Sequence, residues 1–292
     1  MLNFDQIFMN GTISQIVLSK NGSPMANITG NNATVNWTTN TTFSAGSNII
    51  TAITSDSYGF SVTNSLRVIA VDLNAGLVSH LTLDGTYTDT GSSPKTWSIL
   101  GSPAPTFVAG NSGNALAFAA NATSYARASA EFFFGTNSFV LSLWVKSSVS
   151  GWQRRLLGAD LYTSAYTGIN QAYAWLCFNN GRIAYEAVDD TSKSWIVTSP
   201  STYNNGAWHH VVVSIDRRYG LSTMYVDGTK VAEVSQVSTG RFGFTGGVNM
   251  FCINGQYGVA NMFGDGTYDG VRIYNGRALD IYEVQLLRAV GN

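Results

Sequence analysis

Charged side chains are scarce in this chain of 292 residues, which has 16 Lys and Arg, 17 Asp and Glu, and 11% charged residues in all. Soluble domains average about 25%. The formal net charge of -1 gives no broad attraction to nucleic acid or to an anionic membrane. No apolar run approaches the length needed to span a bilayer. We therefore expect no nucleic-acid partner and no membrane insertion.

Cysteine is also scarce, since only Cys177 and Cys252 occur, each in a separate apolar run. The two would form a disulfide if their strands were neighbours, but two buried free thiols is the simpler interpretation. The first residues, 1–5, lack the basic start and apolar stretch of a signal peptide. This predicts synthesis in a cytoplasm and, for a surface protein, release by a route such as virion assembly followed by lysis.

Short strands and turns dominate the second half of the chain. Strands at 208–213 and 224–226, closed by an Asp-Gly turn at 227–228, predict a hairpin. A further strand at 268–274 alternates aliphatic with polar and aromatic residues, and a short amphipathic run at 281–287 follows. The pattern favours an all-β fold with little helix beyond that last run.

This closing pattern resembles a laminin-G-like, concanavalin A-like jelly roll, a two-sheet sandwich whose members mostly bind glycans or proteins and less often hydrolyse them. Earlier segments agree with the resemblance: an entry strand at 77–85, a second strand at 113–118, and a strand at 138–146 that carries a core Trp, here Trp144. The resemblance implies a single jelly roll over residues 77–292.

Residues 12–71 predict a separate small sandwich, because short strands rich in Thr and Ile alternate with Gly and Asn turns. Residues 45–59 resemble the last strands of bacterial and phage immunoglobulin-like domains, which usually act as spacers or docking modules. An N-terminal arm, 1–11, precedes this unit, and a short linker, 72–76, follows it. The predicted fold class is therefore all-β, an immunoglobulin-like sandwich followed by a jelly roll.

Catalytic signatures are missing from the sequence. Sandwich-fold glucanases carry a Glu-x-Asp-x-x-Glu strand that supplies two acids, and the nearest analogue here, Glu-Ala-Val-Asp-Asp at 186–190, is interpreted as a solvated loop. The adjacent His209 and His210 point to opposite faces of a strand, so a structural role is expected for both. No nucleophile elbow, phosphate loop or Cys-x-x-Cys pair occurs. The sequence predicts that this protein is not an enzyme.

Three acids, Asp84, Asp227 and Asp269, each precede Gly and are interpreted as turn formers. The resemblance also places Asp269 where relatives often carry an acid near a structural calcium. Those relatives have Asp-Gly after the strand at 113–118, where this chain has Ala-Ala at 119–120, so one expected carboxylate ligand is missing. We expect no cofactor, with a calcium ion at Asp269 as the alternative.

Sugar binding requires exposed aromatic rings beside amide or carboxylate groups. Loop segments that offer these groups supply the candidate glycan-binding residues Tyr162, Tyr166, Trp195, Tyr257 and Asn254.

The composition and the two resemblances together predict a non-enzymatic bacteriophage surface protein located in the virion, either a capsid decoration or fibre component or a tail-associated adhesin. Its expected partners are a host glycan or other virion proteins, and self-association is left open. The alternatives are a bacterial secreted or cell-surface carbohydrate-binding module, and a glycoside hydrolase or lyase.

Overall fold

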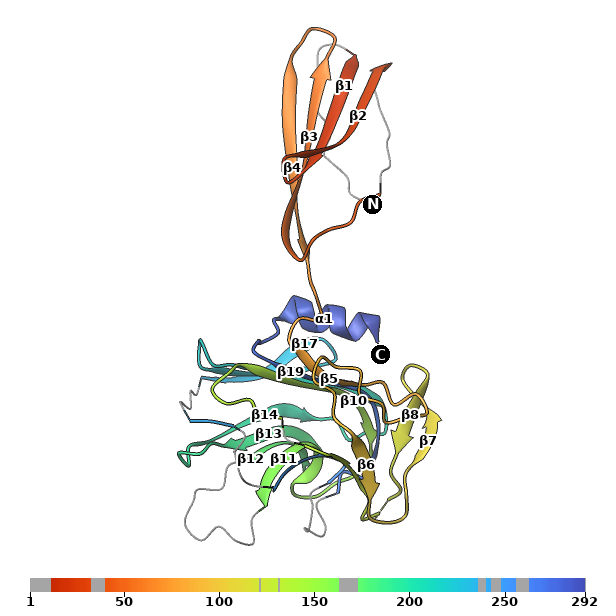
Figure 1. The fold of residues 1–292 in the computed structure, drawn as a ribbon, viewed down its shortest axis with the longest axis vertical. Helices are drawn as coiled ribbons and strands as arrows, with labels where there is room; N and C mark the ends of the chain where they lie inside the picture. The colour runs from red at the N-terminus through yellow and green to blue at the C-terminus, as the bar shows by residue number, and fades with distance from the viewer. Residues whose placement is uncertain are drawn as a thin grey trace. The chain divides into compact units, whose positions relative to one another are not determined.

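The chain forms two compact units, residues 1–73 and 74–292, which are described separately (Figure 1). The computed structural model describes residues 12–32, 40–120, 122–130, 132–162, 173–235, 240–242, 248–255 and 263–291.

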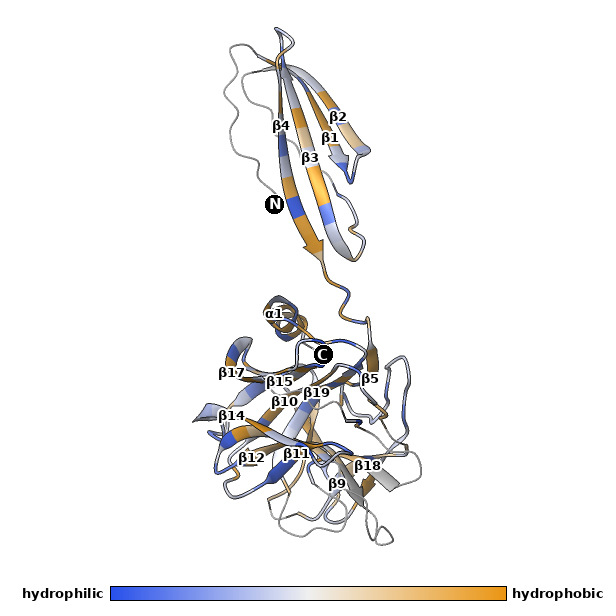
Figure 2. Ribbon diagram, turned by 90° about the vertical axis from the view of Figure 1, so that its left-hand side faces the viewer, coloured by the Kyte–Doolittle hydropathy of each residue, from blue (hydrophilic) through white to orange (hydrophobic). Residues whose placement is uncertain are grey.

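The described part of the first unit is one antiparallel sheet with strand order β2-β1-β3-β4. Figure 2 shows hydrophobic and hydrophilic residues interleaved along β3 and β4, as expected for strands whose side chains alternate between two faces. On one face Ile16, Leu18 and Ala52 form a small buried cluster. The strands are β1 (Ile13–Lys20), β2 (Ser23–Asn32), β3 (Gly46–Asp56) and β4 (Ser61–Ala70).

An immunoglobulin-like sandwich has two sheets, whereas the described residues of this unit form one. Its all-β character agrees with the sequence prediction. The immunoglobulin-like assignment itself is not confirmed.

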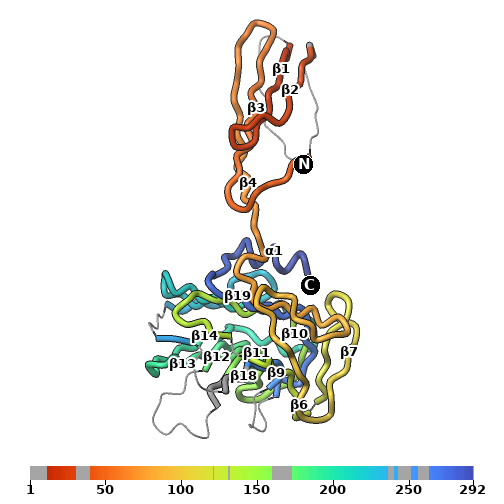
Figure 3. The backbone as a smooth tube through the Cα atoms, in the orientation of Figure 1, coloured from red at the N-terminus to blue at the C-terminus, as the bar shows by residue number. Residues whose placement is uncertain are grey.

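The second unit is a sandwich of two antiparallel sheets. The first sheet has the order β17-β16-β15-β10-β19-β8-β7, with β5 also paired to β19, so that strands from opposite ends of the unit lie side by side (Figure 3). Its strands are β5 (Leu77–Leu81), β7 (Thr106–Ala109), β8 (Asn114–Ala117), β10 (Phe139–Ser147), β15 (Trp208–Asp216), β16 (Leu221–Val226), β17 (Thr229–Ser235) and β19 (Gly266–Asn275).

The second sheet has the order β14-β13-β12-β11-β18-β9-β6. Its strands are β6 (Trp97–Leu100), β9 (Tyr125–Ala128), β11 (Arg154–Tyr162), β12 (Tyr173–Asn179), β13 (Arg182–Val188), β14 (Ser194–Thr202) and β18 (Val248–Ile253).

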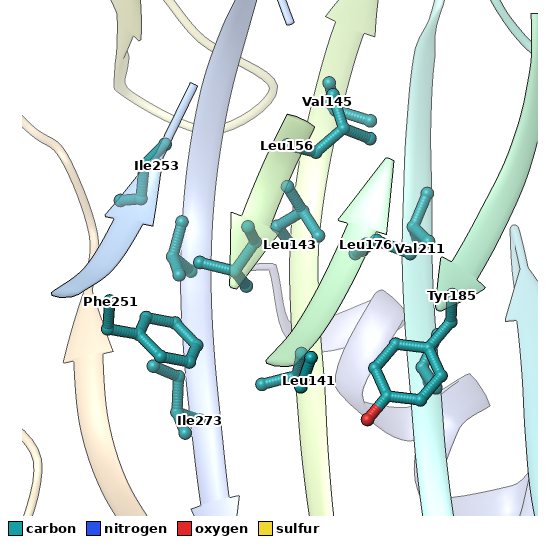
Figure 4. Close-up of a cluster of buried hydrophobic side chains, with 14 of the residues drawn as sticks. Leu141, Leu143, Val145, Leu156, Leu176, Tyr185, Val211, Phe251, Ile253 and Ile273 are labelled. Carbon is teal, nitrogen blue, oxygen red and sulfur yellow. The ribbon is translucent and has the colours of Figure 1, made fainter. Parts of the chain in front are cut away.

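The core of the sandwich lies between these sheets. Leu141 and Leu143 of β10 meet Leu176 of β12 and Phe251 of β18, and all four are buried (Figure 4). Each such side chain contributes roughly 1.5–3 kcal/mol when it leaves water. The jelly roll predicted from the sequence is confirmed, including the hairpin at 208–228 and the strand at 268–274.

Trp144 is buried as predicted, but the prediction that it lies in the sandwich core is wrong. Side chains alternate along β10, and Leu141, Leu143 and Val145 take the core face. Trp144 therefore points to the other face of the first sheet, where its ring lies 5.0 Å from the ring of His210.

The only helix among the described residues, α1 (Ile281–Val290), begins at a capping box formed by Asp280 and Glu283. Val284 and Leu287 are its buried residues. This helix extends the amphipathic run predicted at 281–287. No helix in the described part of the chain is both long and apolar enough to cross a membrane.

Candidate functional site

Two of the predicted glycan-binding residues are buried. Trp195 lies on β14 with only 4% of its surface exposed, packs edge-on against Phe242, and donates from Nε1 to Ser222 Oγ over 2.9 Å. Asn254 donates to the Ser124 carbonyl and accepts from the Tyr268 hydroxyl, both over 3.0 Å. Neither the ring of Trp195 nor the amide of Asn254 is presented to a sugar, so their predicted exposure is wrong.

The other three predicted residues are not tested. Tyr166 and Tyr257 lie outside the described residues, and Tyr162 ends β11 with its side chain also outside them. Their proposed role in sugar binding stays a prediction.

The turn predicted at Asp269 is wrong, since this residue lies within β19 at an irregularity of the pairing with β10. Gly270 there has a φ of 51°, which suits a bulge. Asp269 Oδ2 accepts hydrogen bonds from the backbone N–H groups of Asn111 (2.8 Å) and Ser112 (3.1 Å). This carboxylate thus holds the β7–β8 turn.

Among the described residues, no group of three or more His, Cys, Asp and Glu side chains could hold a metal ion. The calcium alternative at Asp269 stays a prediction. The two histidines have the structural roles predicted for them, because His209 Nδ1 lies 2.8 Å from Asp227 Oδ2 and His210 Nε2 lies 3.1 Å from Ser142 Oγ.

The solvated loop predicted at 186–190 is instead ordered and mostly buried. Asp189 is buried and closes a turn by accepting hydrogen bonds from Thr191 and Lys193. Glu186 is buried within β13, and its carboxylate accepts from Gln153 Nε2 and from Asn179 Nδ2, each over 2.7 Å. These two amides hold the carboxylate in a fixed orientation.

Arg155 extends this network on the face of the second sheet that points away from the core. Its guanidinium carbon lies 4.6 Å from the centre of the Trp175 ring, a cation–π arrangement. Nη2 is 3.4 Å from Gln153 Oε1, so Gln153 connects Arg155 to Glu186. Burial raises the pKa of the neighbouring Cys177 thiol, which stays protonated at neutral pH.

The loop between β10 and β11 carries an aromatic residue that sequence reasoning missed. Trp152 is 65% exposed and directly precedes Gln153. Hydrogen bonds join Gly151 O to Asn180 N (2.8 Å) and Gln153 N to Asn179 Oδ1 (2.7 Å), so the loop is held against the β12–β13 turn. The sequence signal was a Trp directly after a Gly, within a polar segment that lacks strand alternation.

These residues supply what recognition of a polar ligand with an apolar face needs. An exposed indole ring adjoins a network of two amides, a carboxylate and a guanidinium. Hydrolysis of a glycosidic bond requires a second carboxylate across the bond. The described hydrogen-bond partners of Glu186 are amides and a thiol.

The family model for the concanavalin A-like lectin/glucanases superfamily, of laminin-G type, matches residues 120–285. The chain belongs to this family, as its two-sheet jelly roll also indicates. No protein in a search of curated proteins matches the sequence.

Solved structures share the fold at low sequence identity. Domain 4 of AbnA, a GH43 extracellular arabinanase from Geobacillus stearothermophilus, in complex with arabinotriose, is 19% identical with a TM-score of 0.57 over 73% of this chain and 98% of that one. The binding domain of paraclostridial mosquitocidal protein 1 is 16% identical, with a TM-score of 0.52, and the match covers 74% of this chain and 52% of that one. The binding domain of botulinum neurotoxin DC in complex with SialylT is 12% identical, with a TM-score of 0.50, and the match covers 75% of this chain and 52% of that one. This chain spans about half of the last two.

Proposed function

We propose that this protein is a non-enzymatic carbohydrate-binding protein whose jelly roll binds a glycan at Trp152 and at the half-buried amides of Gln153 and Asn179, which the buried Glu186 carboxylate holds in place. The observation that carries the proposal is the exposed Trp152 on a loop fixed by hydrogen bonds. Two proteins with similar folds support it, since one was solved with arabinotriose and another with SialylT.

The energetics of the site agree with sugar recognition. Stacking a pyranose or furanose ring on the indole contributes on the order of 1 kcal/mol beyond area burial, by analogy with aromatic pairs. Each hydroxyl that forms a hydrogen bond with one of these two amides adds about 1 kcal/mol. Because the loop is already held in place, little ordering entropy opposes binding.

The finer proposal is that the protein belongs to a bacteriophage virion, as a capsid decoration, a fibre component or a tail-associated adhesin. In this role the first unit docks on other virion proteins or spaces the jelly roll from them, and the jelly roll attaches to a host glycan. The support is a surface composition poor in charge and the presence of a smaller β unit before the jelly roll. Mass spectrometry of purified particles tests this, and absence of the chain from them would refute it.

A glycan array probed with the full chain tests the binding function. The wild type is expected to bind at least one glycan class, and Trp152→Ala is expected to weaken that binding about tenfold, the equivalent of 1.4 kcal/mol. The matched control is Tyr282→Ala, because Tyr282 is an aromatic residue on α1 with 75% exposure.

The outcomes separate the function from its location. A wild type that binds no glycan contradicts the function, whereas equal binding by the wild type and Trp152→Ala contradicts the site alone. Chromatography of the bound oligosaccharide after prolonged incubation is expected to show no cleavage product, and a product would contradict the non-enzymatic assignment.

A further inference from the structure

Three buried nitrogen-bearing side chains gather on the outer face of the first sheet, the face away from the sandwich core. Arg272 of β19 pairs with Ser142 of β10, and Trp144 of β10 pairs with His210 of β15. Ser142 Oγ lies 3.1 Å from His210 Nε2, which links the two rows. Arg272, Trp144 and His210 are 5%, 6% and 0% exposed.

Helix α1 lies outside this face of the sheet (Figure 1). Just before the helix, the backbone N–H of Leu279 donates to Ser214 Oγ of β15, and this hydroxyl donates to the carbonyl of Leu279. At the other end of the helix, Arg272 Nη2 donates to the carbonyl of Gly291 over 2.6 Å. Arg272 thus contacts the segment that carries α1 from the outer face of the sheet.

One nitrogen atom of each side chain has no hydrogen-bond partner: Arg272 Nη1, Trp144 Nε1 and His210 Nδ1. The guanidinium and indole nitrogens can only donate. Buried polar atoms are nearly always satisfied in native proteins, so each such atom points to an ordered water or an ion. Here the missing partner has to be an acceptor.

Charge distinguishes an ion from a water. Arg272 forms no salt bridge among the described residues. The charge of Asp269 acts on it without direct contact of that kind, while Asp269 Oδ2 accepts from the backbone of the β7–β8 turn. Burial together with the charge of Arg272 lowers the pKa of His210 to about 3, so the imidazole is neutral. A buried guanidinium that forms no salt bridge is costly, and a bound anion would add a direct counter-charge that a water does not supply.

We propose that a small oxyanion binds beneath α1, on the outer face of the first sheet. Arg272 Nη1 and Trp144 Nε1 donate to its oxygen atoms. The Ser142 hydroxyl donates to His210 Nε2. The neutral imidazole then carries its proton on Nδ1, which is the third donor to the anion. The ligand class is phosphate, sulfate or a carboxylate, and the site is independent of the glycan site on the second sheet.

Thermal unfolding of the full chain, refolded from urea in chloride and titrated with sulfate, phosphate or acetate at constant ionic strength, tests the proposal. At a hundredfold excess over Kd the midpoint of the jelly-roll transition is expected to rise by about 5 °C. A response to sulfate and phosphate identifies an inorganic oxyanion, and a response to acetate alone identifies a carboxylate. No response to any of the three overturns the proposal.

Two variants connect the response to the site. Arg272→Met is expected to abolish it, and Trp144→Phe, which keeps an aromatic ring but removes one donor, is expected to weaken it several-fold. Arg182→Met is the matched control, because Arg182 is an exposed arginine on the second sheet. If Arg272→Met fails to fold, Trp144→Phe decides, and a response equal to that of the wild type contradicts the site.

Crystals grown in selenate give direct evidence. An anomalous scattering peak between Arg272 and Trp144 is expected in the wild type and is expected to be lost or weakened in Trp144→Phe. Density that fits an adventitious water only would overturn the proposal.

Discussion

Protonation of His210 is expected to make the jelly roll sensitive to mild acid. Burial, with the charge of Arg272 as the second cause, lowers the pKa of this imidazole from 6.5 to about 3. The folded state therefore keeps His210 neutral at a pH where the unfolded chain already binds a proton. Because the folded pKa is depressed, the stabilisation is fully present above pH 6.5 and is lost as the pH falls below it.

The size of the effect follows from the two pKa values. Each pH unit between them costs about 1.4 kcal/mol, so a fall of roughly 1.5 units below 6.5 removes about 2 kcal/mol from the free energy of unfolding. This window lies above the range in which most carboxylates titrate. His80 adds in the same direction, since burial and Arg272 lower its pKa to about 4.

Urea unfolding in chloride buffers from about pH 7 to about pH 5 measures this loss. His210→Gln retains a polar group that can reach Ser142 but has no titrating proton, and it leaves His80 in place. The difference in pH slope between the wild type and the variant therefore isolates His210. Equal slopes would refute the assignment of the acid sensitivity to this buried histidine.

Three substitutions probe other parts of the jelly roll by urea unfolding or hydrogen exchange. Gly158→Ala is expected to cost about 2 kcal/mol or more, because the residue has a φ of 153° and its new Cβ would lie 2.1 Å from the carbonyl oxygen of Ala174; no change in stability would contradict the backbone placement. Leu141→Ala, at a fully buried position, is expected to cost about 2–5 kcal/mol, and a cost well below that would argue against its core position. Asp269→Ala removes the acceptor of two backbone N–H groups in the β7–β8 turn, so these amides are expected to exchange faster, at a cost of about 2 kcal/mol; unchanged exchange would contradict the role of this carboxylate.

Features determined by neighbouring residues in the chain were predictable from the sequence. The turn at Asp227 and Gly228 has φ values of 53° and 78°, the left-handed conformation that this dipeptide favours. The start of α1 also depends on residues close together in the chain, because the side chains of Asp280 and Glu283 each accept a hydrogen bond from the backbone N–H of the other. The jelly roll itself was predicted from the resemblance of several segments, in their order along the chain, to the laminin-G-like family.

The predicted site depended on contacts that local patterns do not contain. Trp195 follows a serine in a polar segment, yet its indole reaches Ser222 on the other sheet. Asp269 precedes a glycine as a turn residue would, but pairing with β10 places it within a strand. Trp152 was missed because its loop is fixed by Asn179 of β12 and by Asn180 in the turn that follows. Burial and exposure at these positions follow from tertiary pairing.

The state of the two cysteines has a practical consequence for chemical labelling. Cys177 and Cys252 are both buried and form no disulfide, and they are the only cysteines in the chain. An exposed thiolate is the nucleophile that attacks a thiol-directed reagent, so neither buried residue is expected to react in the folded protein. A cysteine introduced at the exposed Asn180, beside the loop that carries Trp152, would then take up a maleimide dye alone. The approach of a ligand to that loop can then be followed by fluorescence without first removing the native cysteines.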